Sequence, residues 1–436
     1  MLSAQEKRDI LMARYYANKE SIDSRIARDI ERYRKGNFRI KVADGPGITV
    51  KVSQKTHDFK FGANIFLLDE FETPEENRKY REFFADHFNL ATVPFYWNTL
   101  EPEEGKPRFE KGCSRIYRRP STELCMEFCA EHGIEPKLHC LVYDQFVPDW
   151  VEKLPLEEAE KKYEQRIAQI AQRYKGRMYE FEVINELLAE SDWKRKSAVS
   201  AKRDILEWAF ALAQKYLPGE TLMINETTSR ILREKGYRCP YFMMIDAALL
   251  RGTPIHKIGV QYHMFTGATA TTEAEFDESI RTSSALNDPV GMLRSLDTLW
   301  QLGLPLEITE VTIPTFGDTP EDEQLQAELL ELWYSLWFSH PGMEGIVYWN
   351  TVEKTAWVDP AGSNRVWSEN NSRGGLLHRD MTPKKSALKL RELLSERWHT
   401  EQTLVTDEEG CISFRGFYGT YEAQAGDQVL TFGLHK

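Results

Sequence analysis

The stretch YEFEVINE at residues 179–186 decides the fold of this 436-residue chain. Aromatic or apolar residues alternate with glutamates, the run turns wholly apolar at Val183 and Ile184, and it ends on Asn185 and Glu186. A second stretch, LPLEITE at residues 304–310, has the same form and ends on Glu310. A buried strand that stops on a carboxylate is typical of a barrel strand that delivers a catalytic group at its C-terminal end. We therefore expect Glu186 and Glu310 to share one active site.

Strands and amphipathic helices alternate around these two stretches from about residue 56 to residue 397. Helical periodicity appears, for example, at residues 157–174, 203–216 and 323–338, and residues 384–394 follow Pro383 as a closing helix. Eight strands with helices between them predict a (β/α)8 TIM barrel of class α/β. The predicted strands are residues 59–64, 89–93, 137–142, 179–185, 222–225, 257–263, 306–310 and 345–349.

The two ends of the chain have a different character. Residues 1–55 combine a charged, helix-compatible segment with a strand–turn–strand pattern, which predicts an N-terminal helix and β-hairpin extension. Residues 398–436 are short β-prone runs separated by glycines. A β segment this small is expected to pack on the barrel or on the N-terminal extension.

Composition excludes several functions. The net charge of −12 argues against binding to nucleic acid or to an anionic membrane, and no run of 18 apolar residues occurs. The six cysteines show no CxxC pair, so reduced thiols are favoured over disulfides or a metal site. The first residues are polar and lack the apolar segment of a signal peptide, so we expect a cytoplasmic protein, although a secreted or periplasmic protein trimmed of its signal peptide would look the same.

Two carboxylates that face one another suit the hydrolysis of a glycosidic bond. One must arrive protonated to donate to the leaving oxygen, and the other must be ionised to attack the anomeric carbon or to activate water there. Asn185 precedes Glu186 directly, where its amide can hold the sugar 2-hydroxyl. The 12% aromatic content also suits sugar binding, although core packing is the expected role of most of these rings.

Over residues 56–395 the chain resembles glycoside hydrolase family 10, the retaining endo-β-1,4-xylanases. Five family motifs occur in order and in similar form. Trp-Asp-Val-Val-Asn-Glu is similar to residues 181–186, Gly-Ile-Gly-x-Gln-x-His to 257–263, Thr-Glu-Leu-Asp to 309–312, Trp-Gly-x-x-Asp-x-x-Ser-Trp to 349–357, and Leu-Leu-Phe-x-x-x-Tyr-x-Pro-Lys to 376–384.

The resemblance implies a role for each matching residue. Glu186 would be the acid/base and Glu310 the nucleophile of a double displacement, with carboxyl groups ~5–5.5 Å apart. His263 would hydrogen-bond Glu310, and Asn225 and Glu226 would support the site. No metal or organic cofactor is implied. The residues implied to bind substrate are Asn185, His139, Gln261, His263, Trp349 and Trp357.

The sequence departs from the family on two strands. The second-strand motif at residues 92–97 is two residues shorter and lacks the Glu-Asn and Lys groups that bind the next sugar. On the third strand His139 is kept, but Tyr143 and Asp144 stand where the family has Trp and His. The distal sugar subsite is therefore expected to differ. Trp97, Tyr143 and Trp150 are further candidates for the cleft.

We expect a β-linked polysaccharide or oligosaccharide substrate, with xylan first. Two alternatives stay open: a retaining β-glycosidase for another or a decorated polysaccharide, and a non-catalytic carbohydrate-binding protein. The sequence leaves the oligomeric state and the choice between internal and terminal cleavage open.

Overall fold

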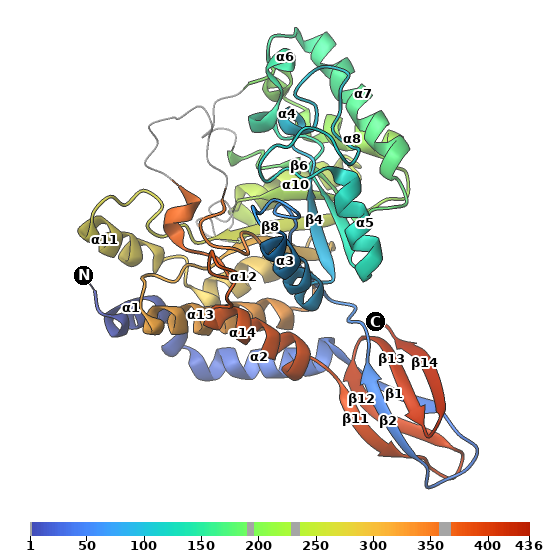
Figure 1. The fold of residues 1–436 in the computed structure, drawn as a ribbon. Coiled ribbons are helices and arrows are strands. Elements are labelled where there is room, and N and C mark those ends of the chain that lie inside the picture. The colour runs from blue at the N-terminus through green and yellow to red at the C-terminus, as the bar shows by residue number, and fades with distance from the viewer. Residues whose placement is uncertain (1, 190–195, 228–235, 357–367) are drawn as a thin grey trace.

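The computed structural model describes residues 2–189, 196–227, 236–356 and 368–436. Its centre is a closed barrel in the strand order β10-β3-β4-β5-β6-β7-β8-β9, with all neighbours parallel. The predicted (β/α)8 barrel is confirmed (Figure 1). The barrel strands are β3 (Lys60–Asn64), β4 (Leu90–Pro94), β5 (Glu135–His139), β6 (Glu180–Asn185), β7 (Leu222–Glu226), β8 (Lys257–His263), β9 (Leu306–Thr312) and β10 (Met343–Tyr348).

Helices surround the barrel and cover the outward faces of its strands. The predicted helices at residues 157–174, 203–216 and 323–338 are found as α7, α8 and α13, and the closing helix as α14. Helix α13 begins at a capping box in which Thr319 and Asp322 bond each other's backbone, with Pro320 in the first turn. Among the described residues, the α-helices from β3 onward are α3 (Pro74–His87), α4 (Trp97–Leu100), α5 (Thr122–His132), α6 (Asp149–Glu152), α7 (Leu156–Tyr174), α8 (Ile205–Tyr216), α10 (Pro240–Leu250), α11 (Glu273–Ser283), α12 (Pro289–Trp300), α13 (Pro320–Ser339) and α14 (Lys385–Glu392).

The N-terminal segment forms two helices, α1 (Ala4–Tyr16) and α2 (Lys19–Tyr33). Helix α1 packs against α11, α12 and α13, and α2 packs against α13 (Figure 1). A buried ion pair of 2.9 Å between Lys7 and Asp322 fixes α1 to the start of α13. No helix within the described ranges is both long enough and apolar enough to cross a membrane.

The predicted N-terminal β-hairpin is wrong, because its two strands pair with the C-terminal segment instead of with each other. Strand β1 (Lys35–Lys41) pairs with β12 (Cys411–Phe417), and β2 (Thr49–Gln54) lies between β11 (Glu401–Val405) and β13 (Gly419–Ala425). Strand β14 (Gln428–Leu434) completes the second sheet. We call these six strands the β unit.

The β unit has a small hydrophobic core, and this core explains the pairing. Alternate residues of β2 turn Val50 and Val52 inward, where they meet Ile412, Phe414 and Tyr421 from the C-terminal strands. A two-stranded hairpin has no second layer to cover such a face, so the C-terminal strands supply it. The predicted contact between the C-terminal β segment and the N-terminal extension is found.

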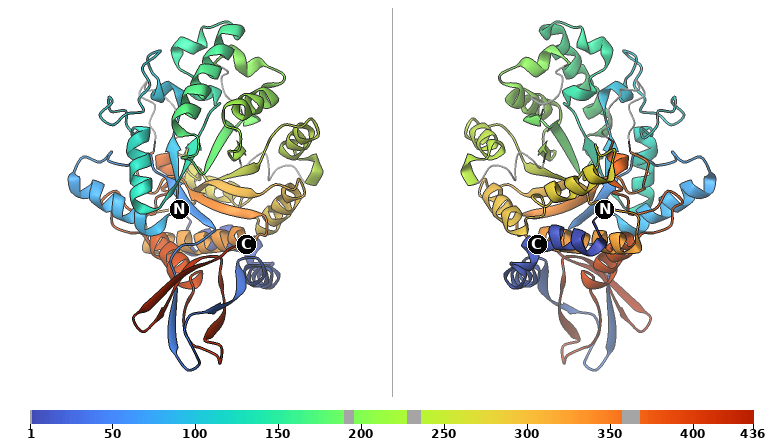
Figure 2. Two further views of the ribbon diagram at one scale, coloured as in Figure 1. Left: turned by 90° about the vertical axis from the view of Figure 1, so that its right-hand side faces the viewer. Right: turned by 90° about the vertical axis from the view of Figure 1, so that its left-hand side faces the viewer.

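The β unit lies at the end of the barrel where the strands begin (Figure 2). The backbone N–H of Asp58, just before β3, donates to the Tyr418 carbonyl, and His435 contacts the Asp58 carboxylate at 2.9 Å. Lys436 reaches the Pro341 carbonyl just before β10. The strand ends that carry Glu186 and Glu310 are therefore at the opposite end of the barrel.

A chain that stops at residue 397 is expected to be markedly less stable than the full chain. Removal of β11–β14 exposes Val50 and Val52 and leaves both edges of β2 without a partner, an arrangement that also promotes aggregation. Thermal unfolding followed by circular dichroism measures the effect, with the shorter deletion of residues 427–436 as a control that keeps β11, β12 and β13. An unchanged melting temperature for residues 1–397 would contradict the shared core.

Candidate active site

Glu186 follows the last residue of β6 in a left-handed backbone conformation, with φ of 55°. Its backbone N–H donates to the Asn225 carbonyl on the neighbouring strand, which holds this uncommon conformation in place. One carboxylate oxygen accepts the Tyr143 hydroxyl at 2.7 Å and the other accepts the Gln261 amide at 2.9 Å. Both oxygens of this half-buried carboxylate are therefore oriented by neutral donors.

A β-bulge turns Glu310 into the barrel. Between Ile308 and Glu310, β9 has one residue more than its neighbour β8, where Val260 is followed directly by Gln261. Thr309 and Glu310 consequently both reach Asn225, through the Thr309 hydroxyl at 2.6 Å and a Glu310 oxygen at 3.0 Å. Regular alternation would send these two neighbours to opposite faces of the strand.

A second bulge lies in β6 at Val183. Glu182 pairs with Met223 and Ile184 with Ile224, so β6 again has the extra residue. Asn185 thereby turns toward the barrel interior, where its side-chain oxygen accepts the Asn225 amide at 2.9 Å. The two bulges thus precede the two candidate glutamates on their own strands.

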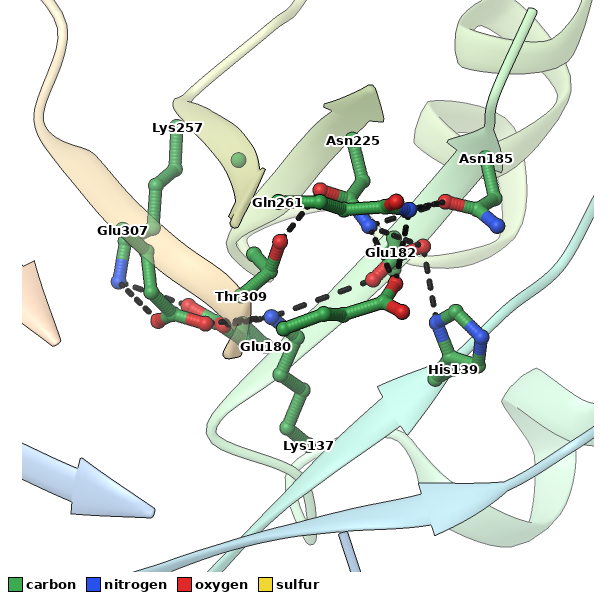
Figure 3. Close-up of polar contacts among 12 residues, drawn as sticks. Lys137, His139, Glu180, Glu182, Asn185, Asn225, Lys257, Gln261, Glu307 and Thr309 are labelled. Carbon is green, nitrogen blue, oxygen red and sulfur yellow. Dashed lines mark hydrogen bonds and ion pairs between the residues drawn. The ribbon is translucent and has the colours of Figure 1, made fainter. Parts of the chain in front are cut away.

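Gln261 on β8 connects the two glutamates. Its side-chain nitrogen donates to Glu186 at 2.9 Å and to Glu310 at 3.0 Å (Figure 3 shows Gln261 beside Asn185 and Asn225). The two acceptor oxygens can therefore lie no farther apart than the sum of these bonds, about 6 Å. The two candidate carboxylates meet at one place, as predicted from their positions at strand ends.

Glu310 is 4% exposed and receives three nitrogen contacts. They come from Asn225 and Gln261 on one oxygen and from His263 on the other, each at 3.0 Å. Burial raises the pKa of Glu310 well above its ordinary value, the charge of His139 opposes this rise, and Glu186 adds to it. The surrounding nitrogens favour the ionised carboxylate against the effect of burial.

His263 at the end of β8 is the partner predicted for Glu310. Burial lowers the pKa of His263 to about 4, so the ring is neutral at neutral pH. One ring nitrogen contacts Glu310 and the other contacts the Thr312 hydroxyl at 2.9 Å. A neutral ring that accepts the Thr312 hydroxyl donates its remaining N–H to Glu310.

His139 at the end of β5 is fully enclosed. Its two ring nitrogens contact Glu182 at 2.9 Å and the Tyr96 hydroxyl at 3.0 Å. Burial works against the charged ring, but Glu182 outweighs it and the pKa of His139 is raised. Because His139 is only 1% exposed, a sugar would have to displace the Tyr96 hydroxyl to bind it. Its role as a sugar ligand stays a prediction.

Trp349 follows β10 and lies between the two histidines. Its ring is edge-on to His139 at 5.5 Å and to His263 at 6.1 Å, and it packs on Phe66. This placement agrees with a wall beside the carboxylates. Trp357, the other predicted wall, lies outside the described residues.

The three further candidates for the cleft differ in what they contact. Tyr143 reaches Glu186, as described above. Trp97 is instead buried against Trp150 and Tyr163, which indicates core packing. The Trp150 indole N–H donates to the Glu101 carbonyl.

The sequence interpretation did not single out Tyr96 and Glu182. Tyr96 lies within the shortened second-strand motif, and Glu182 stands where the family motif has Asp. Comparison with the family motifs could therefore have identified both residues as part of the site. Glu226, the proposed support next to Asn225, accepts the backbone N–H groups of Leu188 and Thr227 instead of contacting Glu310. It anchors the chain just beyond Glu186, and burial raises its pKa to about 7.

One group of side chains in the described part of the chain is close enough to share a metal ion: His139, Cys140 and Glu182. The His139 nitrogens are already paired with Glu182 and Tyr96, and burial raises the pKa of the Cys140 thiol well above its ordinary value. Because a metal-ligating thiol must lose its proton, these residues fit a hydrogen-bonded support better than a metal site.

A (β/α)8 barrel that brings two carboxylates together at the C-terminal ends of its strands is the arrangement found in barrel glycoside hydrolases. The chain belongs to glycosyl hydrolase family 10, whose sequence model matches residues 55–388. The resemblance seen in the sequence motifs is thereby confirmed.

Two relatives with known names align over most of this chain. It is 26% identical over 403 residues to the anti-sigma-I factor RsgI6 of Acetivibrio thermocellus, covering 90% of this chain and 45% of that protein. It is 25% identical over 390 residues to endo-1,4-beta-xylanase 2 of Arabidopsis thaliana, covering 87% and 31%. The chain therefore spans less than half the length of these two relatives.

The fold is shared with solved xylanase structures. Xylanase 10B from Thermotoga petrophila RKU-1 in complex with xylobiose aligns with a TM-score of 0.60 and 22% identity, over 78% of this chain and 95% of that chain. Native xylanase 10B from Thermotoga maritima aligns with a TM-score of 0.58 and 22% identity, over 78% and 96%.

Proposed function

We propose that this protein is a retaining glycoside hydrolase that cleaves β-1,4-xylosidic bonds in xylan or xylo-oligosaccharides. The observation that carries the proposal is the Gln261 amide, which donates to Glu186 and Glu310 at 2.9 and 3.0 Å. An oxygen separation of at most about 6 Å fits the ~5–5.5 Å of retaining enzymes better than the ~6.5–9.5 Å of inverting ones. The xylanases among the relatives and structural neighbours support xylan as the substrate.

Each group then has a step in a double displacement. Glu310, oriented by Asn225, Gln261 and His263, attacks the anomeric carbon, and Glu186 protonates the departing oxygen. Glu186 next takes a proton from water, which attacks the glycosyl-enzyme and releases the sugar with retained configuration. Gln261 contacts both carboxylates, so it can hold their spacing through both steps.

The direct test is the anomer first released from a defined xylo-oligosaccharide, followed by proton NMR immediately after mixing. Retention predicts the β-anomer first, with the α-anomer appearing only as the product mutarotates. First release of the α-anomer would show inversion and would contradict the role of Glu310 as nucleophile.

A second candidate is a retaining β-glycosidase that acts on a decorated or different polysaccharide. Tyr96, Tyr143 and Asp144 favour it, because they rebuild the region next to the reacting centre. Asp144 accepts the backbone N–H groups of Lys196 and Ser197 and so holds the backbone at these two residues, where the family has a second histidine in place of Asp144. A hydrolysis panel of unbranched xylan, branched xylan, mixed-linkage glucan and aryl glycosides separates the two.

The third candidate is a non-catalytic carbohydrate-binding protein. One relative is named as an anti-sigma-I factor and not as an enzyme, and its alignment covers 90% of this chain. Binding of xylo-oligosaccharides in calorimetry without turnover in the same panel would favour it. The contacts made by both carboxylates argue for turnover.

Tyr143→Phe is expected to lower kcat on xylo-oligosaccharides by about 10- to 100-fold. The phenol donates to a Glu186 oxygen at 2.7 Å, and this bond strengthens as Glu186 gives up its proton in the transition state, since hydrogen bonds to charged groups contribute about 1.5–3 kcal/mol. Steady-state kinetics measure the change. Tyr216→Phe is the matched control, because its phenol donates to Glu164 at the same 2.7 Å on the helical surface. Equal kinetics in both variants would contradict a role for Tyr143 in orienting Glu186.

A further inference from the structure

The barrel interior beneath the carboxylates contains an unusual set of charges. Barrel interiors are filled mainly by branched apolar side chains. Here two lysines and two glutamates, each at most 2% exposed, fill the space instead (Figure 3). We call Lys137, Glu180, Lys257 and Glu307 the interior ion cluster.

Each lysine of the cluster contacts both of its glutamates. Lys137 pairs with Glu307 at hydrogen-bond distance and with Glu180 at 3.3 Å. Lys257 pairs with Glu180 at 2.7 Å and with Glu307 at 3.9 Å. Burial opposes the charge on Lys137, but Glu307 and Glu180 outweigh it and raise the pKa of Lys137, so this lysine stays charged.

The two lysines differ in what else they contact. Lys257 also pairs with Glu344 at 3.1 Å, a residue near the start of β10 and thus toward the β unit. Lys137 also lies 3.9 Å from Glu182, on the side of the candidate active site (Figure 3). Lys137 is 1% exposed and Lys257 is 2% exposed, so the two lysines form a natural pair for comparison.

Glu182 lies beside two groups of the candidate site. One Glu182 oxygen contacts His139 at 2.9 Å and lies 3.4 Å from the Asn225 amide nitrogen, whose shortest bond goes to Asn185 at 2.9 Å. That amide also donates to Glu310 at 3.0 Å. Glu182 is 1% exposed, and the side chains of Lys137 and His139 lie next to its carboxylate.

We propose that Lys137 is a positioning residue for the reaction, whose buried ammonium group acts through Glu182 to hold His139 in place near Glu310. The inference rests on the proposed glycosidase function and extends it to a residue that lies below the reacting centre. Lys257, bound to the same two glutamates, balances their charge without taking part in this link.

The charges around Glu310 set the direction of the expected pH effect. Lys137 and His139 favour its ionised form, whereas Glu186 and Glu182 disfavour it. Loss of Lys137 therefore favours protonated Glu310, which cannot attack. The groups that contact Glu310, or whose charges act on it, are Lys137 and His139 on β5, Glu182 on β6, Glu186 just after it, Asn225 on β7, and Gln261 and His263 on β8.

The experiment compares Lys137→Met with Lys257→Met in the full-length protein. The profile of kcat/KM against pH on a defined xylo-oligosaccharide is recorded for both variants, for the wild type and for Lys137→Arg. Lys137→Met is expected to move the acidic limb to higher pH, with a loss of roughly tenfold at pH 5. Lys257→Met should keep the wild-type limb, and Lys137→Arg should restore it. Superimposable limbs for the two methionine variants would overturn the inference.

The Glu182→Gln variant provides a second test, which does not depend on whether Lys137→Met folds. It keeps the shape of the side chain but removes its charge, and kcat is expected to fall by roughly tenfold or more. In the Glu182→Gln background, a further Lys137→Met change should move the acidic limb less than it does in the wild type, because only the direct effect of the ammonium charge on Glu310 remains. Wild-type kcat in Glu182→Gln would overturn the inference. Absence of turnover in the wild type would instead contradict the proposed function itself.

Discussion

Glu310→Gln is expected to lower kcat on xylo-oligosaccharides by at least about 10⁴-fold, because an amide cannot attack the anomeric carbon. The side chain keeps its size and one oxygen, so the contact with Asn225 or with His263 can persist and the fold should be retained. Reducing-sugar release under saturating substrate measures the loss, and calorimetry should show that oligosaccharide still binds.

Glu226→Gln is the matched control for this variant. Glu226 is also a buried glutamate at the end of a barrel strand, one strand away from Glu186, but its oxygens bond the backbone of Leu188 and Thr227. The loss of activity in Glu226→Gln should be orders of magnitude smaller than the loss in Glu310→Gln. Turnover of Glu310→Gln equal to that of the wild type would remove Glu310 from the mechanism.

The pH profile of the wild type follows from the same carboxylate. The attacking form of Glu310 is ionised, and burial raises its pKa well above 4.5. The rate therefore increases as pH rises through the pKa of Glu310, and the acidic limb of kcat/KM should lie above pH 4.5. An acidic limb below that value would show that the surrounding donors outweigh burial.

The barrel itself could be predicted from sequence because each strand carries its own signal. The strands are buried on both faces and read as short apolar runs that end on polar residues, as at residues 179–186 and 304–310. Such local patterns do not depend on the partner strand. They identified all eight barrel strands to within a few residues at each end.

The pairing of the β unit could not be predicted in the same way. Strand β2 reads as half of a hairpin, yet its partners β11 and β13 lie about 350 residues further along the chain. Alternation shows that Val50 and Val52 face a core, but not which strands complete that core. A short turn between two β-prone runs favours the local pairing, and here the larger shared core prevails.

The bulges explain why contacts within the site were harder to predict than its residues. Strict alternation from Glu307 would turn Glu310 outward, and strict alternation from Glu182 would turn Asn185 outward. Each strand has one extra residue, Thr309 in β9 and Val183 in β6, and this residue turns the Glu310 and Asn185 side chains inward instead. Sequence motifs identify which residues belong to the site, whereas register decides what each side chain contacts. Tyr96 shows the consequence, since its bond to His139 depends on this packing.

Glu186→Ala is expected to lose activity according to the leaving group of the substrate. Xylo-oligosaccharides depart as poorly acidic alcohols and need the proton that Glu186 gives, so kcat/KM should fall by about 10³-fold or more. A 2,4-dinitrophenyl β-xyloside departs as a stable anion without a proton, and its first step should change little. The removed carboxylate also activates water, so the glycosyl-enzyme should accumulate on Glu310, where intact-protein mass spectrometry detects it.

Azide separates the two tasks of Glu186. A small anionic nucleophile needs no general base and can enter the space left by the carboxylate, so it should speed turnover of the dinitrophenyl substrate in Glu186→Ala and yield a β-glycosyl azide. Gln261 and Tyr143, which bond Glu186 in the wild type, offer donors in that space. An α-glycosyl azide from this variant would mean that azide had displaced the leaving group directly, with a single inversion and no glycosyl-enzyme. Glu186 would then be the nucleophile and Glu310 the acid/base, because azide would have taken the place of the missing nucleophile.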